Sequence, residues 1–390
     1  MMTTIDYARY GVTADQIEFW KVVRKFADKE VMPIAEQVDR EAAFPHELFT
    51  KIAANGLMGV PYDPEFGGSG ADHVCSAIAL EELSRASGSV GCSVNAHMSL
   101  VASLINLFGT QEQKERFLVP LATGEKIGAF GLSEPEAGSD VGNISTTAVR
   151  DGDGWRIRGS KTFNTNGSVA SLFTITAKVS SGPSEEGRLT TFVVESDREG
   201  FSVSRELRKL GMRGSPTCEL RLDDVWVPDE NLLGEAGDGY RQVMKVIEGA
   251  RVNVASMCVG IAQAAYDEAV KYAQERVQFG RPIGANQGVQ WLIADMATEI
   301  DAARLMVLST ARMRDEGRST KLHASMAKRF ASDMAVRVTN TAVEVFGGYG
   351  FTQDFPVERF MRDVKLYQMG EGTNQICRMV IARELMPAIR

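Results

Sequence analysis

The chain has 390 residues, 44% of them hydrophobic and 24% charged, with a formal net charge of −8 at pH 7. This length predicts two or three domains, and the composition is ordinary for a soluble globular protein. The negative charge argues against a nucleic-acid-binding surface. No apolar run approaches the roughly 18 residues that a membrane-spanning helix needs, so no membrane span is expected.

The five cysteines and four histidines argue against disulfide and metal chemistry. The cysteines are odd in number, scattered, and never spaced as C-x-x-C, which favours a reducing compartment. The histidines show no metal-ligand spacing, so no metal site is expected. Residues 1–6 have neither the pattern of a signal peptide nor that of a transit peptide. We therefore expect a cytoplasmic protein.

The first third of the chain has helical periodicity. Residues 13–16 and 110–113 have the spacing of capping boxes, and each predicts the start of a helix. Pro33 predicts a kink or an end in the first long helix. An all-α domain is predicted over residues 1–124.

Residues 125–232 change to a pattern of short strands. Residues 155–158 (Trp-Arg-Ile-Arg) alternate apolar and polar side chains with a period of two. The Asp-Gly-Asp-Gly turn at 151–154 just before them predicts a hairpin. Turns at this spacing predict a small antiparallel sandwich or barrel.

Residues 233–390 return to helical patterns. Three long, alanine-rich segments, at 243–277, 290–316 and 320–346, predict a bundle like a four-helix bundle. The expected fold class is therefore α+β and multidomain, with the order all-α, all-β, all-α.

A glutamate between two glycines is the most informative local feature. Glu371 stands between Gly370 and Gly372, after a charged segment and before a helix predicted at 375–385. Glycine lets the backbone approach a ligand closely and adopt conformations that other residues avoid. A carboxylate held there can act as a general base, whereas the simpler interpretation is a first-turn glutamate favoured by the helix dipole.

Three further motifs lie in register with this one along the whole chain. Residues 130–140 end a strand in a Pro/Gly turn, which exposes backbone N–H groups and the Ser133 hydroxyl to the edge of a planar heterocycle. Residues 161–167 form the second motif. In the third, at 275–283, a helix ends at glycine and proline and presents an arginine, whose fork suits a pyrophosphate. With the α–β–α order, these motifs resemble the acyl-CoA dehydrogenase family, in the short-, medium- or branched-chain type that carries its base in a C-terminal Glu-Gly-Thr motif.

The resemblance implies FAD as the cofactor, Glu371 as the base, and three further groups of site residues. The positions lining the flavin would be Phe130, Leu132, Ser133, Phe163, Thr165, Thr373 and Gln375. The positions reaching a neighbouring subunit's FAD would be Arg276, Phe279, Gln287, Glu344, Gly347 and Gly348. The positions on the substrate side would be Ser139, Glu248, Arg251, Gly370 and Gly372. This chain departs from the usual family pattern at Phe163, Asn164 and Glu344, where relatives often have tryptophan, a branched apolar residue and glutamine.

The implied reaction is the dehydrogenation of an acyl-CoA thioester to the 2-enoyl-CoA. Glu371 would remove the α-proton, its backbone N–H would bind the thioester oxygen, and the β-hydride would pass to flavin N5. Gly370 leaves space beside the reacting carbons, which indicates a branched, cyclic or aromatic acyl group; the alternative is that other side chains fill this space. The type of family member that the chain resembles implies a short or medium acyl group. Residues 90–94 lack the arginine of glutaryl-type relatives, which argues against a decarboxylating enzyme.

The resemblance also implies an electron-transfer flavoprotein as the electron acceptor and a homotetramer built as a dimer of dimers. Three alternatives stay open. The enzyme could act on acyl groups of a carrier protein, or it could be a flavin-dependent oxidase of the same fold. A non-catalytic flavin-binding scaffold of this fold is the third, but such a protein should have lost Glu371.

Overall fold

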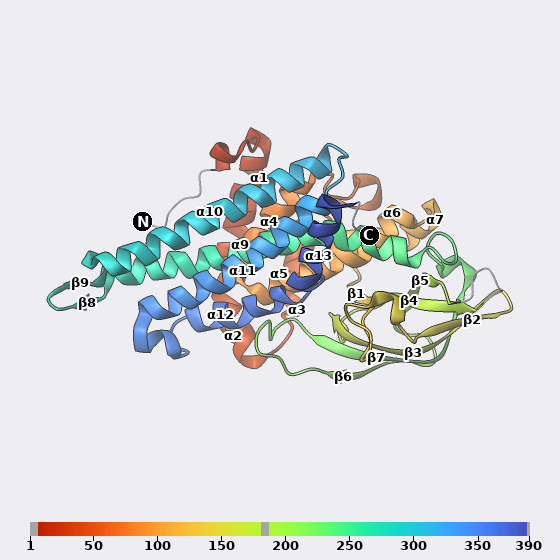
Figure 1. Cartoon of the computed structure of the whole chain (residues 1–390). Coiled ribbons are helices and arrows are strands. Elements are labelled where there is room, and N and C mark those ends of the chain that lie inside the picture. Colours follow the sequence, from red (N-terminus) through yellow and green to blue (C-terminus); the bar gives the residue numbers. More distant parts are fainter. Residues whose placement is uncertain (1–6, 181–186, 388–390) are drawn as a thin grey trace.

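The computed structural model describes residues 7–180 and 187–387 (Figure 1). Residues 1–6, 181–186 and 388–390 lie outside this description, and with them the N-terminal segment on which the cytoplasmic expectation partly rests. A long helical body carries a twisted sheet beside one of its ends (Figure 1). The predicted order of helices, strands and helices is confirmed.

The N-terminal helices begin where the capping residues predicted. The Thr13 hydroxyl accepts a hydrogen bond from the N–H of Gln16, and the N–H of Thr13 donates to Oε1 of Gln16; Thr110 and Gln113 form the same pair of bonds. Pro33 lies in a short 3-10 turn that separates the first long helix from the next, so the predicted break is confirmed. The elements are η1 Tyr7–Tyr10, α1 Ala14–Phe26, η2 Ala27–Val31, η3 Met32–Ile34, α2 Ala35–Glu41, α3 His46–Ala54, η4 Pro64–Phe66, α4 His73–Ala86, α5 Gly88–Asn95, η5 Ala96–Ala102, α6 Ser103–Phe108, α7 Gln111–Gln113, η6 Lys114–Leu118 and α8 Val119–Ala122.

One helical segment of this region, Gly88–Phe108, is long and apolar enough to cross a membrane by length and composition. Its most apolar stretch is 89% buried inside the protein. An apolar helix in such surroundings is a core helix, since its side chains are already removed from water.

The central sheet has seven strands in the order β1-β4-β2-β3-β7-β6, with β5 paired to β4. The predicted hairpin is confirmed, because Asp151 at the end of β2 pairs with Gly154 at the start of β3. The strands are β1 Gly128–Gly131, β2 Thr147–Asp151, β3 Gly154–Thr165, β4 Leu172–Ser180, β5 Leu189–Glu195, β6 Phe201–Glu206 and β7 Thr217–Pro228, with the 3-10 turn η7 Val141–Asn143 between β1 and β2.

The sheet is mixed rather than purely antiparallel. β4 runs parallel to both β1 and β2, and the other pairs are antiparallel. Local alternation predicts that a strand exists but carries no information about the direction of a partner distant in the chain.

The C-terminal region is built around one long helix, α9, which packs against α4, α10 and α11. Its middle part is continuously buried, from Gly249 to Ala265. The elements are η8 Asp229–Asn231, α9 Gly239–Glu275, β8 Val277–Gln278, β9 Arg281–Pro282, η9 Ile283–Ala285, α10 Gln287–Asp315, α11 Lys321–Phe346, η10 Gly347–Phe351, α12 Val357–Val364, η11 Lys365–Gln368 and α13 Asn374–Leu385. The domain limits 1–124, 125–232 and 233–390 stay a prediction.

Side-chain hydrogen bonds join the sheet to the helices on both sides of it. Asn166 at the end of β3 donates to the carbonyl of Ser93 on α5, at 2.9 Å. The Ser93 hydroxyl donates to that of Ser215, at 2.8 Å. The N–H of Met212 donates to the Asp363 carboxylate on α12, at 2.5 Å. The segment between β6 and β7 is therefore tied both to α5 and to α12.

Candidate active site

Glu371 lies in the turn between η11 and α13 and has an unusual backbone conformation. Its φ is +55° and that of Gly372 is +86°, so two successive residues are left-handed. For a residue with a side chain this costs roughly 1–2 kcal/mol. The conformation persists only where surrounding contacts impose it, which is typical of functional sites.

Two cations from separate helices hold this turn by its carbonyl groups. Arg251 on α9 donates from Nε to the carbonyl oxygen of Glu371, at 3.2 Å. Lys328 on α11 donates from Nζ to the carbonyl oxygen of Gly372, at 2.7 Å. Arg251 is itself oriented by a bond from Nη1 to the Ser325 hydroxyl, at 3.1 Å. The resemblance pointed to Arg251, whereas Lys328 was missed.

The carboxyl group of Glu371 is tuned by opposing effects. Burial raises its pKa above the ordinary value, while the charges of Lys328 and Arg251 lower it. A carboxylate with a raised pKa is a stronger base than one in water, and it can still be ionised when cations stand nearby. These are the properties that proton removal from a carbon acid requires.

The predicted flavin-lining turn after β1 is held against β3 and α9. Leu132 forms a small apolar cluster with Val243 and Ile247 of α9, which half-buried Phe130 also contacts. The carbonyl of half-buried Ser133 accepts from the N–H of residue 162, at 2.9 Å. The turn therefore lies beside the helix that carries Arg251.

A buried ion pair fixes the same turn from beneath. Lys161, which is 0% exposed, donates to the carbonyl of Leu132 at 3.1 Å and to the Glu134 carboxylate at 2.7 Å. Burial alone would raise the pKa of Glu134, but Lys161 and the hydroxyls of Ser145 and Thr146 hold it at about 2. The second motif thus supplies a structural lysine whose role its sequence did not predict.

At the end of β3 the second motif presents an exposed aromatic ring. Phe163 is 68% exposed and has a φ of +58°, while Thr165 is half-buried. Asn164, where relatives often have an apolar residue, is buried and donates to the carbonyl of Cys218 at 2.8 Å. The amide of Asn164 therefore ties β3 to β7.

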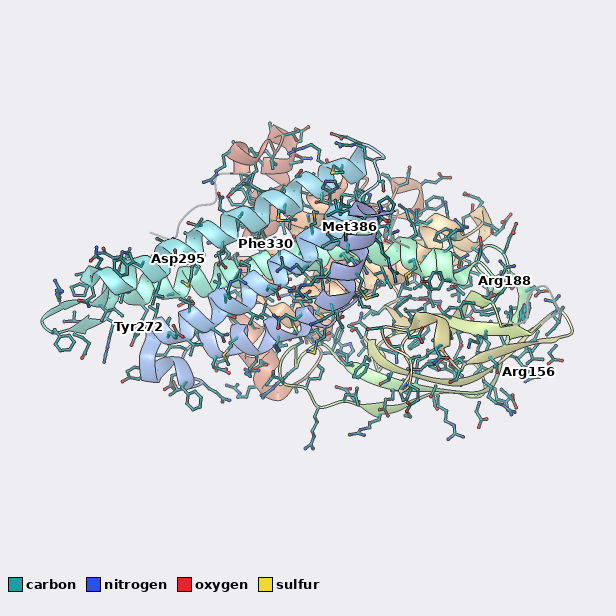
Figure 2. All side chains as sticks on the ribbon, in the orientation of Figure 1. Arg156, Arg188, Tyr272, Asp295, Phe330 and Met386 are labelled. Carbon is teal, nitrogen blue, oxygen red and sulfur yellow. The ribbon has the colours of Figure 1, made fainter. Side chains whose placement is uncertain are left out.

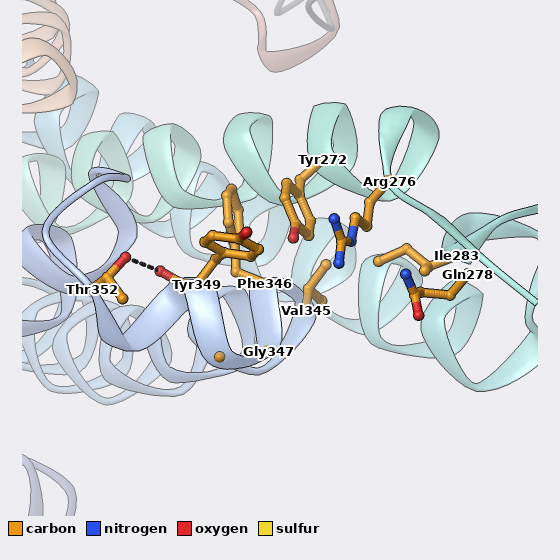
Figure 3. Close-up of a pocket in the computed structure, with 10 residues that line it drawn as sticks. Tyr272, Arg276, Gln278, Ile283, Val345, Phe346, Gly347, Tyr349 and Thr352 are labelled. Carbon is orange, nitrogen blue, oxygen red and sulfur yellow. Dashed lines mark hydrogen bonds between the residues drawn. The ribbon is translucent and has the colours of Figure 1, made fainter.

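The residues expected to meet a neighbouring subunit's FAD gather at the opposite end of the long helices. Three of them, Arg276, Gly347 and Gly348, line a cavity of about 580 Å³ (Figure 3), where Arg276 lies over the Tyr349 ring at 5.5 Å. A Cβ atom on Gly347 or Gly348 would meet nothing within 4 Å, so the backbone there is open to a ligand. Phe279 in the adjoining hairpin is 97% exposed, with a φ of +52°. Gln287 and Glu344 are exposed as well.

These two groups of residues are far apart in a single chain. Arg251 and Arg276 are at the middle and the end of α9, and 25 residues of helix span roughly 37 Å. Figure 2 shows Tyr272, which lines the cavity, at the end of the helices away from Arg156 and Arg188 on the sheet. The structure brings together the residues around Glu371 and separates them from those around Arg276.

The remaining predicted residues have varied surroundings. Glu248 accepts from the hydroxyl and N–H of Thr320, at 2.7 and 3.2 Å, and so closes the start of α11. Thr373 accepts from the N–H of residue 376, at 3.2 Å, as the N-cap of α13. Ser139, in the motif at 130–140, and Gln375, in the first turn of α13, are exposed.

The arrangement fits FAD. Phe163 presents an exposed aromatic ring that can pack on a planar heterocycle, and the cavity near Arg276 joins aromatic rings to a cation, as an adenine and a pyrophosphate require. Within residues 7–180 and 187–387, no group of three His, Cys, Asp or Glu side chains could hold a metal ion.

Comparison with known proteins identifies the family. Models of the N-terminal, middle and C-terminal domains of acyl-CoA dehydrogenase match residues 13–125, 129–225 and 237–386. A short-chain-specific acyl-CoA dehydrogenase of Clostridium acetobutylicum is 44% identical, over 96% of this chain and 99% of that protein. The chain therefore belongs to the acyl-CoA dehydrogenase family of flavoprotein oxidoreductases, whose members bind FAD.

Solved structures agree with this assignment. Butyryl-CoA dehydrogenase from Megasphaera elsdenii has a TM-score of 0.93 at 39% identity, over 96% of this chain and 98% of that one. A chain from a structure of the electron transferring flavoprotein of Acidaminococcus fermentans has a TM-score of 0.93 at 41% identity, over 99% and 100%. The predicted family, fold class, enzyme class and cofactor are confirmed.

Proposed function

We propose that the protein oxidises the Cα–Cβ bond of a short acyl-CoA thioester to the 2-enoyl-CoA, with Glu371 as the base for the α-proton. The observation that carries this proposal is the state of Glu371. Its carboxyl has a raised pKa, and its backbone is held in a left-handed conformation by Arg251 and Lys328. A merely helix-capping glutamate needs neither feature.

The backbone of the same residue supplies a second function. The N–H of Glu371 has no hydrogen-bond acceptor among the residues that the structure describes. We propose that it donates to the thioester oxygen, where negative charge develops as the α-proton leaves. One residue would then both remove the proton and stabilise the resulting enolate.

The residues proposed to hold the flavin are Phe130, Leu132, Ser133, Phe163, Thr165, Thr373 and Gln375. When bound, FAD accepts the hydride from the β-carbon, which is the hard part of the chemistry. The chain's own contribution is to place the base and the N–H donor and to exclude water from the turn.

A short acyl chain is supported by the substrates for which the two relatives are named. Gly370 adds a further indication, since a Cβ atom there would come no closer than 3.6 Å to the carbonyl of Leu366. The glycine is thus not required by packing, and it leaves room beside Glu371. We propose that a branched or cyclic short acyl group uses this room.

The separation of the two site regions supports an oligomer. Since Arg276 lies roughly 37 Å along α9 from Arg251, we propose that Arg276, Phe279, Gln287, Glu344, Gly347 and Gly348 serve an FAD held by a second copy. A homotetramer and an electron-transfer flavoprotein as acceptor complete the proposal, the latter supported by the Acidaminococcus structure. The five buried free cysteines accord with a cytoplasmic location.

The decisive experiment is an anaerobic titration of the purified holoenzyme with a panel of straight, branched and cyclic acyl-CoA thioesters, following the visible flavin absorption. Bleaching by a short member of the panel is the expected result. If no CoA ester bleaches the flavin but a carrier-protein thioester does, the carrier-protein alternative holds. Reoxidation by air as fast as by an electron-transfer flavoprotein would favour an oxidase.

A further inference from the structure

We propose that Lys328 is a positioning residue for the catalytic base: its buried ammonium fixes the left-handed Glu371–Gly372 turn and favours the ionised form of the Glu371 carboxyl. The inference rests on the proposed role of Glu371 and extends it to a residue of another helix. No motif of the sequence pointed to Lys328.

The first observation is that Lys328 is a fully buried ammonium without a carboxylate in direct contact. It is 0% exposed, and among the described residues no carboxylate oxygen lies within 4 Å of its Nζ. Its acceptors are neutral, the carbonyl of Gly372 at 2.7 Å and the amide oxygen of Asn374 at 3.1 Å. Burial of an uncompensated charge is costly, so such a group normally indicates a function.

Lys161 shows how this chain treats a buried lysine that only supports the fold. It is also 0% exposed, but Nζ lies 2.7 Å from the carboxylate of Glu134. Lys161 thus has a dedicated counter-ion in direct contact, whereas Lys328 does not. The nearby acid with which Lys328 interacts is Glu371.

The second observation is the geometry of the contact. Lys328 and Ser332 are four residues apart on one face of α11, and both bind the start of α13. The Asn374 amide donates to the Ser332 hydroxyl at 3.0 Å, while Lys328 bonds on both sides of Thr373. Since α11 is a rigid helix, it fixes the backbone carbonyl of Gly372 and the side-chain amide of Asn374, both of which follow Glu371 in the chain.

The charged groups around the base are few. Arg251 faces Glu371 from α9 and Lys328 faces it from α11, and the thiol of Cys92 faces it from α5. Burial raises the pKa of Cys92 to about 11, so this thiol is neutral at working pH. The thiols of Cys258 on α9 and Cys377 on α13 face Lys328.

The electrostatic consequence has a definite sign. Burial raises the pKa of Glu371, and Lys328 is the leading charge that opposes the rise. Burial lowers the pKa of Lys328 in turn, and Glu371 is among the groups that raise it again. Without the ammonium, the Glu371 carboxyl would hold its proton to higher pH, and less of the enzyme would carry an ionised base.

The test is the pH dependence of turnover in K328Q, K328M and K328R, with S332A as the matched control on the same helix face. K328Q removes the charge and keeps N–H donors. We therefore expect the acid limb of its pH–rate profile to move to higher pH by about one unit, so that the rate at a given pH on that limb is about tenfold lower. K328M should also lower the plateau, because the turn loses a donor. K328R and S332A should keep the wild-type limb.

A second measurement follows the carboxyl directly and does not depend on turnover. Infrared difference spectra against pH should show the protonation of Glu371, identified by the band that disappears in E371Q, at a higher pH in K328Q than in the wild type. An unshifted band and limb in K328Q would overturn the proposal. A shifted limb in K328R, which keeps the charge, would also contradict a role for the charge.

Failure of this proposal and failure of the proposed function give different results. Wild-type turnover in E371Q would contradict both the role of Glu371 as the base and the proposed function. An inactive E371Q together with a wild-type pH–rate profile in K328Q would contradict only the proposed role of Lys328.

Discussion

The two ends of the long helices differ in how they hold strained residues. Glu371 and Phe279 both have left-handed backbones, at φ +55° and +52°. Around Glu371, two cations bond successive carbonyls, and the following helix is capped. Phe279 is 97% exposed, in a hairpin at the tip of the molecule (Figure 1).

The difference indicates where each site is completed. Strain persists where the surroundings impose it, and at Glu371 those surroundings belong to the same chain. At Phe279 the left-handed backbone belongs to the two-residue turn of the β8–β9 hairpin, in which Gly280 is left-handed as well, and the side chain is left exposed. The Glu371 end is held by contacts within one chain, whereas the Arg276 end is open, in keeping with our proposal that a second copy completes it.

The largest expected effect concerns chemistry at the preorganised end. E371Q keeps the shape and the N–H donor but loses the base, so turnover should fall by about 10²–10⁴-fold or more. FAD content per subunit should stay at the wild-type level, because the amide is nearly isosteric. Steady-state kinetics with the best acyl-CoA and the flavin absorption ratio measure both quantities, and a variant with near-wild-type turnover contradicts the assignment.

The next effect tests how the same end is stabilised. K161M leaves the Glu134 carboxylate buried without its cation, which should cost about 3–5 kcal/mol in the free energy of unfolding. The replacement of both partners, K161M with E134L, should recover much of this loss. Denaturant unfolding at neutral pH is the measurement, and equal stability of single and double variants would show that the pair does not act as a unit.

The pH dependence of stability follows from the same pair. The pKa of Glu134 is about 2 in the folded protein, below the ordinary value of about 4.3. The unfolded state therefore binds the proton more readily, and the contribution of Glu134 is complete above about pH 4.3 and lost as the pH falls towards 2. E134Q should flatten this acid limb of the stability curve.

The next effect concerns the Arg276 end, which we propose a second copy completes. R276Q should weaken FAD retention by about 10–100-fold, the contribution of a hydrogen bond to a charged group, and should increase FAD release on dilution. R281Q in the same hairpin is the control, since Arg281 bonds to Asn286 at 2.8 Å and does not line the cavity. Flavin fluorescence against protein concentration separates the two, and equal retention in R276Q and R281Q would argue against a site shared between subunits.

Local signals predicted much of the fold. The capping boxes at Thr13 and Thr110, the hairpin at 151–154 and the long C-terminal helices all follow from neighbouring residues, and all are present. The parallel pairing of β4 with β1 and β2 was not predicted, because strand direction depends on residues far apart in the chain.

The same limit applies to the site. Motifs pointed to Glu371 and Arg251, yet Lys328 lies 44 residues from its acceptor Gly372, on a helix whose sequence reads as an ordinary buried stripe. Only the packing of α11 against α13 shows that this lysine binds the turn. The left-handed conformation of Glu371 could likewise not be predicted from the sequence, since the glycines on both sides of it adopt such a conformation more readily.

The smallest effect uses those two glycines as a matched pair. Gly372 has a φ of +86°, and a Cβ atom there would lie 3.0 Å from Nη2 of Arg251, so G372A should cost about 1–2 kcal/mol and disturb the arginine that holds Glu371. Gly370 is not left-handed and has room, so G370A should change stability by less than about 0.5 kcal/mol. Its effect should instead be on selectivity, with a lower kcat/KM for branched than for straight acyl-CoA. Thermal unfolding and kcat/KM ratios distinguish the two roles; a destabilised G370A with unchanged selectivity would mean that Gly370 serves the backbone and not the acyl group.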